Sequence, residues 1–129
     1  DAAHFVMGAF LGMIWCFERL FIKTPSGRKR YNVLAALDSQ SKELIKVTNE
    51  SYINSSTVCE LIAAIRVLHS EVSITLVLDN ARYQHCQLVV DYANLMKIEL
   101  LFLPSYSPNL NLIERLWRLV KAKALKNKY

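Results

Sequence analysis

Two apolar runs, Ile74-Thr-Leu-Val-Leu-Asp79 and Ile98-Glu-Leu-Leu-Phe-Leu103, lie on either side of a stretch with helical character from about Gln84 to Met96. Nearly continuous apolar runs of this length are typical of strands that are buried on both faces. A strand, a helix and a second such strand form a βαβ unit, in which the two strands are parallel. This segment therefore predicts an α/β protein that contains a parallel pair of strands.

The segment before this unit predicts three strands and one helix. The strands are predicted at residues 1–7, in the apolar stretch that passes Gly8 and Gly12 to about Ile22, and at residues 32–38. Short strands with tight connections are typical of an antiparallel meander. A helix capped by Ser55, Ser56 or Thr57 is then predicted, because apolar residues recur at helical spacing at positions 58, 61, 62, 65 and 68.

The last part of the chain predicts a helix after a proline-containing break. The break is Pro104-Ser-Tyr-Ser-Pro108, in which Ser107 is the predicted N-cap and Pro108 the first helical residue. The apolar stripe of this helix consists of Ile113, Leu116, Trp117, Val120 and Ala124. The complete order is βββ-α-β-α-β-α, which predicts a mixed sheet, with an antiparallel meander beside the parallel pair.

Composition and charge limit the class of protein. With 129 residues, 53% of them apolar and 21% charged, the chain is long enough for one globular domain. The longest uncharged apolar run, at 5–16, has 12 residues, which is too short to span a bilayer, so no membrane partner is expected. The three cysteines show no metal-binding or disulfide spacing and predict free thiols of a cytosolic protein.

The net charge of +5 lies on one segment. Charges in residues 1–108 cancel, whereas residues 109–129 hold six basic residues and only Glu114 as an acid. Such a stripe suits the phosphate backbone of a nucleic acid, and a solvated helix face is the alternative.

Three carboxylates are candidates for a metal site. Asp79 lies at the carboxyl end of a buried strand, where open α/β sheets bind their ligands. Asp1 lies on the first strand and Glu114 in the first turns of the last helix. Converging carboxylates need a cation to stay ionised, and hard oxygen donors without His or Cys suit Mg²⁺ or Mn²⁺. The alternatives are that Asp79 caps a turn and that Glu114 interacts with the helix dipole.

The stretches Leu78-Asp-Asn-Ala-Arg-Tyr83 and Leu101-Phe-Leu-Pro-Ser-Tyr-Ser-Pro-Asn-Leu-Asn-Leu-Ile-Glu-Arg-Leu-Trp117 resemble the catalytic domain of DDE transposases of the mariner superfamily, above all its bacterial insertion-sequence branch. The opening Asp1-Ala-Ala-His-Phe and the segments at 27–28 and 32–37 match as well. The gap of 34 residues between Asp79 and Glu114 is characteristic of this family. The resemblance covers essentially the whole chain.

This resemblance implies a ribonuclease H-like fold with helices on both faces of the sheet. It implies that Asp1, Asp79 and Glu114 are catalytic and hold two Mg²⁺ or Mn²⁺ ions. Asn80 is expected to steady Asp79 through a hydrogen bond. The implied reaction is strand cleavage at transposon ends, followed by transfer of the 3′-hydroxyl into target DNA. The alternatives are a nuclease of the same fold without strand transfer and a catalytically inactive DNA-binding remnant.

The expected partner is double-stranded DNA, namely the inverted-repeat ends of the transposon and the target. Candidate phosphate contacts are Arg28, Arg82, Arg118 and Lys121. The resemblance also implies a homodimer of the full-length protein in the bacterial cytoplasm, associated with the nucleoid. We expect residues 1–129 to be a catalytic core truncated at its N-terminus, without the helix-turn-helix region of the family, and to be inactive as an isolated fragment.

Overall fold

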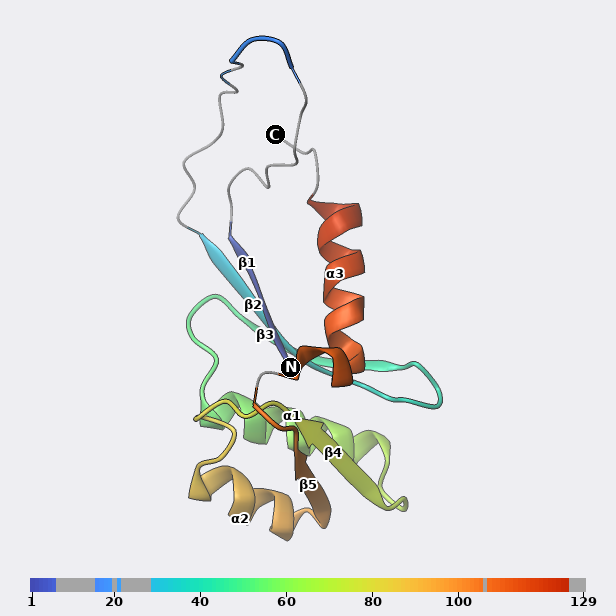
Figure 1. Cartoon of the computed structure of the whole chain (residues 1–129). Coiled ribbons are helices and arrows are strands. Elements are labelled where there is room, and N and C mark those ends of the chain that lie inside the picture. Colours follow the sequence, from blue (N-terminus) through green and yellow to red (C-terminus); the bar gives the residue numbers. More distant parts are fainter. Residues whose placement is uncertain (7–15, 20, 22–28, 106, 126–129) are drawn as a thin grey trace.

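The first sheet contains three antiparallel strands in the order β1-β2-β3. These are β1 (Ala2–Val6), β2 (Arg30–Leu37) and β3 (Leu44–Asn49) (Figure 1). The middle residues of β2 are buried on both faces because Leu34 lies in one core cluster and Val33 and Ala35 lie in the other. The computed structural model describes residues 1–6, 16–19, 21, 29–105 and 107–125.

The second sheet is the parallel pair that the sequence predicts. β4 (Ile74–Leu78) and β5 (Ile98–Phe102) are joined through the helix α2 (Gln87–Leu95), and β4 residues pair with β5 residues from Ile74↔Ile98 to Leu78↔Phe102. The βαβ unit is therefore confirmed. Within the described residues, β4 pairs only with β5, so the antiparallel trio and the parallel pair form two sheets where one mixed sheet was expected.

One of the three predicted antiparallel strands lies largely outside the described residues, and one observed strand was not predicted. The stretch expected as the second strand lies largely outside the described residues, and 16–19 and 21 within it are not in a strand. The third strand of the described antiparallel sheet is β3, whose alternating exposed and half-buried residues do not predict a strand. β3 packs against β2 because the tight turn at 38–43 brings it back antiparallel.

That turn is organised by Asp38. Its carboxylate accepts hydrogen bonds from the main-chain N–H groups of Gln40, at 2.6 Å, and Ser41, at 3.1 Å. The bond from Gln40, followed by the bond from Ser41, lowers the pKa of Asp38 below its usual value. The turn also places Lys42 at a φ of 63°, which is an uncommon conformation for a residue with a Cβ atom. The hydrogen bonds to Asp38 offset part of the conformational free energy that the positive φ of Lys42 costs.

The helix α1 (Ser55–Leu68) has a capping box one residue earlier than predicted. Asn54 is the N-cap, because its side chain accepts a hydrogen bond from the Thr57 main chain at 3.1 Å. At the other end, Arg66 donates hydrogen bonds to the carbonyl oxygens of His69 and Val72, and across to Met96 and Lys97 after α2. This guanidinium therefore joins the ends of α1 and α2.

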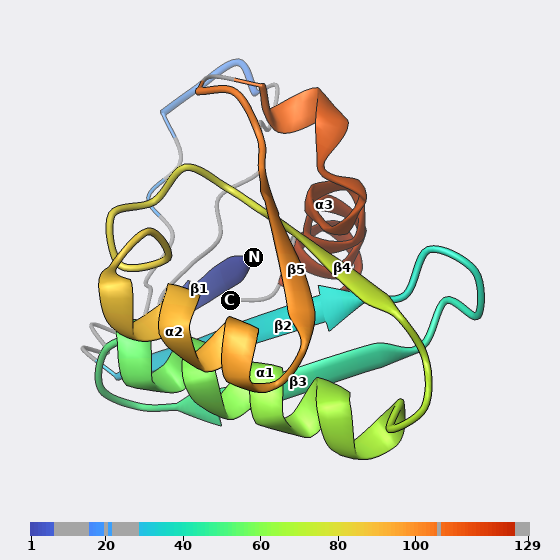
Figure 2. The same cartoon turned by 90° about the horizontal axis from the view of Figure 1, so that it is seen from below.

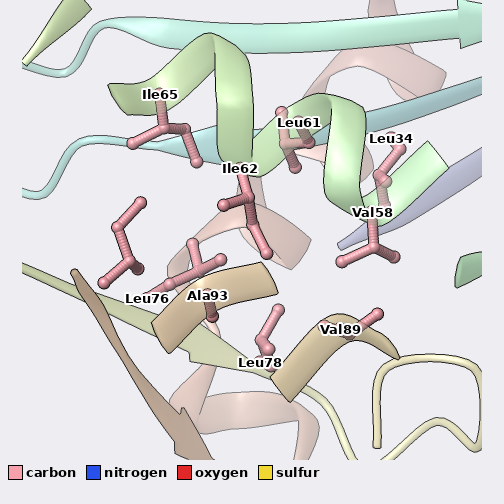
Figure 3. Packing of buried hydrophobic residues seen from close by; sticks show 10 residues of the cluster. Leu34, Val58, Leu61, Ile62, Ile65, Leu76, Leu78, Val89 and Ala93 are labelled. Atoms are coloured by element: carbon pink, nitrogen blue, oxygen red, sulfur yellow. The ribbon is translucent and has the colours of Figure 1, made fainter. Parts of the chain in front are cut away.

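The main core lies between α1, α2 and both sheets. Figure 3 shows side chains of α1 and α2 directed toward those of β4, with Leu34 of β2 at one side. The predicted apolar stripe of α1 is buried at Val58, Leu61, Ile62 and Ile65, but its last member, Leu68, is exposed. Leu68 is the final residue of the helix.

A second core lies on the opposite face of the antiparallel sheet. Here α3 (Leu112–Ala124) packs Ile113 and Trp117 against Ala3, Val33 and Ala35. Figure 2 shows α3 and α1 on opposite sides of β2. Helices therefore cover both faces, as expected. In the predicted stripe of this helix, residues 116 and 120 are half-buried and 124 is exposed.

The predicted start of α3 is also wrong. Residues Pro108–Leu110 form a separate 3₁₀ turn, closed by a bond from Leu110 N–H to the Ser107 carbonyl at 3.1 Å. Asn111 then takes an extended conformation and caps α3. Ser107 and Pro108 thus begin a short turn before the helix. In the described part of the chain, no helix is both long and apolar enough to cross a membrane.

Candidate active site

Asp79 directly follows β4, at the carboxyl end of the parallel pair, as the sequence predicts. Its side chain is half-buried. The strand end is fixed by a bond from the Leu103 N–H to the Leu78 carbonyl at 2.9 Å, which extends the β4–β5 ladder by one step. The carboxylate therefore leaves a rigid strand and not a loose loop.

Asn111 holds this carboxylate. Its Nδ2 donates a hydrogen bond to Asp79 Oδ1 at 2.8 Å, and its own Oδ1 accepts one from Ile113 N–H at 3.3 Å. With 8% of its surface exposed, Asn111 is nearly buried. One side chain thus caps α3 and ties the start of that helix to the end of β4. Sequence reasoning missed Asn111 because a single asparagine in a loop gives no signal of its partner.

Glu114 lies in the first turn of α3, and its N–H bonds the Asn111 carbonyl at 3.3 Å. Its side chain is half-buried. A carboxylate is favourable at this end of a helix because of the positive end of the dipole. The hydrogen bond from Asn111 to Asp79 therefore sets where Glu114 lies relative to β4.

Asp1 begins the chain beside β2. Its carbonyl accepts a bond from Ala35 N–H, and its α-amino group donates one to the Ala35 carbonyl, both at 2.9 Å. Its side chain Oδ1 accepts a bond from the Ala2 N–H at 2.7 Å. Burial lowers the pKa of the α-amino group, and the negative charge of Asp79 partly opposes this shift. The α-amino group of Asp1 is therefore within electrostatic range of Asp79.

Comparisons with known proteins show the family of the chain. The profile of a family described as DDE superfamily endonuclease matches residues 18–129. The chain belongs to this family. No curated protein matches the chain.

Solved structures show the fold of this DDE-family chain in larger proteins. A chain of the Mos1 strand transfer complex matches with a TM-score of 0.74 at 17% identity, over 99% of this chain and 40% of that one. The Mos1 mariner paired-end complex with Mn gives 0.73 at 14% identity, over 99% and 41%. A chain of the simian T-cell lymphotropic virus intasome structure gives 0.65 at 17% identity, over 74% and 34%. The DDE-family chain therefore has the ribonuclease H-like transposase fold and spans about two fifths of the Mos1 chains.

The three candidate carboxylates have donor atoms that suit a metal ion, but the described structure does not bring them close enough together to hold one. Asp1, Asp79 and Glu114 offer only hard oxygen donors, which fit Mg²⁺ or Mn²⁺. Within the residues that the structure describes, however, no three His, Cys, Asp or Glu side chains come close enough together to hold one ion. The DDE-family chain places Asp79 beside Asn111 and near Asp1, but does not bring all three carboxylates into one cluster.

Asn80 does not make the hydrogen bond that the sequence predicts. Its amide donates to Ser105 Oγ at 2.8 Å, which ties the turn after β4 to the segment after β5. The contact to Asp79 is made by Asn111 instead. The physical reason is that successive residues at a strand end point in opposite directions.

The candidate DNA contacts are only partly placed. Arg28 lies outside the described residues. Arg82 is exposed in the turn that follows Asp79, and Arg118 is exposed on α3. Lys121 is half-buried near the end of the same helix.

The turn after Asp79 also carries His85. Its ring stacks on Phe102 of β5, with ring centroids 3.8 Å apart and the planes inclined by 20°. Tyr83 in the same turn is half-buried, and burial, followed by the charge of Asp79, raises the pKa of its hydroxyl. Gln84, between Tyr83 and His85 in the sequence, is buried. Glutamine is mostly exposed in proteins, so the sequence does not predict this burial.

Proposed function

We propose that this chain is the catalytic core of a DDE transposase, which cleaves a DNA strand at the end of a transposon and joins the freed 3′-hydroxyl to target DNA. The observation that carries the proposal is the bond from Asn111 to Asp79, which joins the N-cap of the helix that carries Glu114 to the residue that follows β4. The α-amino group of Asp1 lies within electrostatic range of Asp79. Membership of the DDE superfamily endonuclease family and the likeness to Mos1 support it.

The proposed cofactor is Mg²⁺ or Mn²⁺, as two ions that Asp1, Asp79 and Glu114 would hold; binding would have to bring the three carboxylates together, because they form no cluster within the described residues. When bound, such ions activate the attacking oxygen and stabilise the leaving oxygen of a phosphodiester. The chain itself orients the carboxylate oxygens that would bind the ions. Asn111 fixes the rotamer of Asp79, and the first turn of α3 carries Glu114.

The proposed partner is double-stranded DNA, bound mainly through its phosphates. Arg82 is exposed in the turn that follows Asp79, and we propose that it contacts the strand that is cut. Arg118 and Lys121 on α3 extend the positive charge away from the site. The longer protein is proposed to act as a homodimer, because two transposon ends must be processed together.

The test is the cleavage of transposon-end DNA by the longer protein in Mg²⁺ or Mn²⁺. Asp79→Asn keeps an acceptor for Asn111 but removes the charge, so the fold should persist while the rate falls at least about a hundredfold. Asp91→Asn, on the exposed side of α2, is the matched control and should cleave at the wild-type rate. Wild-type cleavage by Asp79→Asn would refute the assignment.

A second measurement distinguishes a transposase from a nuclease. End DNA with a precut 3′-hydroxyl is supplied together with target DNA. Joined product, absent with the Asp79→Asn variant, supports strand transfer. Cleavage without joining would show a nuclease of the same fold.

A further inference from the structure

The helices α1 and α2 lie level with each other. Figure 2 shows them side by side. The Arg66 guanidinium donates hydrogen bonds to the carbonyl of His69, the C-cap of α1, at 3.0 Å and to the carbonyl of Met96, the C-cap of α2, at 2.8 Å. The carboxyl ends of both helices therefore lie at the same level, and the helices run in the same direction.

Cys59 and Cys86 lie equally far from this level. Cys59 is ten residues before His69 on α1, and Cys86, the N-cap of α2, is ten residues before Met96. At about 1.5 Å per helical residue, each cysteine lies about 15 Å from the end of its helix. Cys59 also lies on the same face of α1 as Arg66, because seven residues make about two turns. The face of α1 that reaches α2 therefore places Cys59 beside Cys86.

The two thiols share the same surroundings. Both are free, half-buried and packed against the main hydrophobic core. Burial, followed by the negative charge of a Cys86 thiolate, raises the pKa of Cys59, so the two sulfur atoms are within electrostatic range of each other. A disulfide needs Cα atoms about 4.4–6.8 Å apart. Helix axes about 8–10 Å apart, with Cα atoms about 2.3 Å from each axis, bring facing residues into this range.

The position of Cys86 at the start of α2 allows its side chain to turn. Its main chain is extended, and its side chain does not cap the helix. The Sγ atom donates one hydrogen bond, to the Tyr83 carbonyl at 3.5 Å. Because a thiol is a weak donor, rotation of this sulfur toward Cys59 loses only one weak bond.

We propose that Cys59 and Cys86 are a redox pair, which hydrogen peroxide closes to a disulfide that ties the turn after Asp79 to α1. First, the Cys86 sulfur attacks one peroxide oxygen and the O–O bond breaks, which leaves a sulfenic acid and releases water with the thiol proton. The Cys59 sulfur then attacks the Cys86 sulfur, and the hydroxyl group leaves as water with the Cys59 proton. Two thiols thus transfer two electrons to one peroxide, giving one disulfide and two waters.

The order of these steps follows from the surroundings of the two sulfur atoms. The thiolate is the reactive form of cysteine, and the raised pKa of Cys59 keeps its thiol protonated. Cys86 therefore reacts with the peroxide, and Cys59 resolves the sulfenic acid. The consequence for DNA cleavage rests on the proposed function, because the bond restrains the turn that begins at Asp79. Formation of the bond is measured without DNA or metal, so the pair can be confirmed even if the proposed function fails.

The test treats the 1–129 chain with hydrogen peroxide, alkylates the remaining thiols, and analyses an unreduced digest by mass spectrometry. We expect the peptide that links Cys59 to Cys86 to exceed every link to the exposed Cys16 by at least about tenfold, and dithiothreitol to reverse it. In concentrated urea this preference should disappear, because it depends on the register of the folded helices. Equal links among the three cysteines of the folded protein would overturn the proposal.

Three serine variants test the roles of the single thiols. Cys16→Ser is the matched control and should form the bond as the wild type does. Cys59→Ser should leave Cys86 as a sulfenic acid, which dimedone traps, and Cys86→Ser should trap at least about tenfold less at Cys59. A sulfinic acid at Cys86 of the wild-type chain, formed in place of the disulfide, would show that Cys59 does not reach it and that the proposal is wrong.

Discussion

Asn111 is the side chain whose replacement tests the site most directly. It makes two separable hydrogen bonds, one to Asp79 Oδ1 at 2.8 Å and one that caps α3 through Ile113 N–H at 3.3 Å. Asn111→Ser keeps a capping oxygen but is too short to reach Asp79. Asn111→Ala removes both bonds. The two variants therefore separate the role of the cap from the contact with the carboxylate.

The magnitudes follow from the nature of each bond. A hydrogen bond to a charged group contributes about 1.5–3 kcal/mol, and an N-cap about 1 kcal/mol. Because Asp79 is only half-buried, we take the lower end for its bond. Asn111→Ser should then lower the free energy of unfolding by about 1.5 kcal/mol, and Asn111→Ala by about 2.5 kcal/mol.

The assay is urea unfolding of the 1–129 chain, with a double-mutant cycle between positions 111 and 79. Asn109→Ser, at an exposed position two residues before Asn111, is the matched control and should change stability by less than about 0.5 kcal/mol. Asp79→Ala and Asn111→Ser should couple by at least about 1 kcal/mol. Additive effects within about 0.5 kcal/mol would refute the claim that this bond links β4 to α3.

Three further predictions concern the rest of the molecule. Arg66→Lys should lower the free energy of unfolding by about 2 kcal/mol in urea, since an ammonium cannot reach the carbonyl oxygens at the ends of both α1 and α2. Because the pKa of Asp38 is lowered in the folded state, mainly by the Gln40 N–H, its contribution to stability is present above about pH 4 and disappears as the pH falls through the lowered pKa. Asp38→Asn should flatten that acid dependence in unfolding measured from pH 6 to pH 2. In DNA binding, replacing Lys121 and Lys123 by Gln should reduce the slope of log affinity against log salt by about 0.9 for each phosphate that is no longer neutralised.

Each of these predictions has a matched control. Arg82→Ala removes an exposed guanidinium and should leave stability within about 0.5 kcal/mol, so an equal decrease would mean that the effect of Arg66 is generic. Asp91→Asn should leave the acid dependence intact. Replacing Lys42 and Lys46, which are exposed at the β2–β3 hairpin, should leave the salt slope unchanged if α3 is the DNA-binding surface.

The strong local signals of the sequence were confirmed. The apolar runs of β4 and β5 and the periodic faces of α1 and α3 were predicted because each feature is contained in a window of a few residues. β3 was missed because its six residues carry a weak alternation with only three apolar side chains. It became a strand through pairing with β2, which supplies hydrogen bonds that the segment could not satisfy alone.

The sequence by itself determined which groups are available: Asp79 and Glu114 with 34 residues between them, and a positive charge concentrated on residues 109–129. Only the tertiary structure decided how these groups are held. Which side chain bonds Asp79, where α3 begins, and why Gln84 is buried depend on elements that are far apart along the chain. The physical reason is that hydrogen-bond partners and burial depend on which distant segments the folded chain brings into contact, whereas residue types and their spacing can be counted along the sequence.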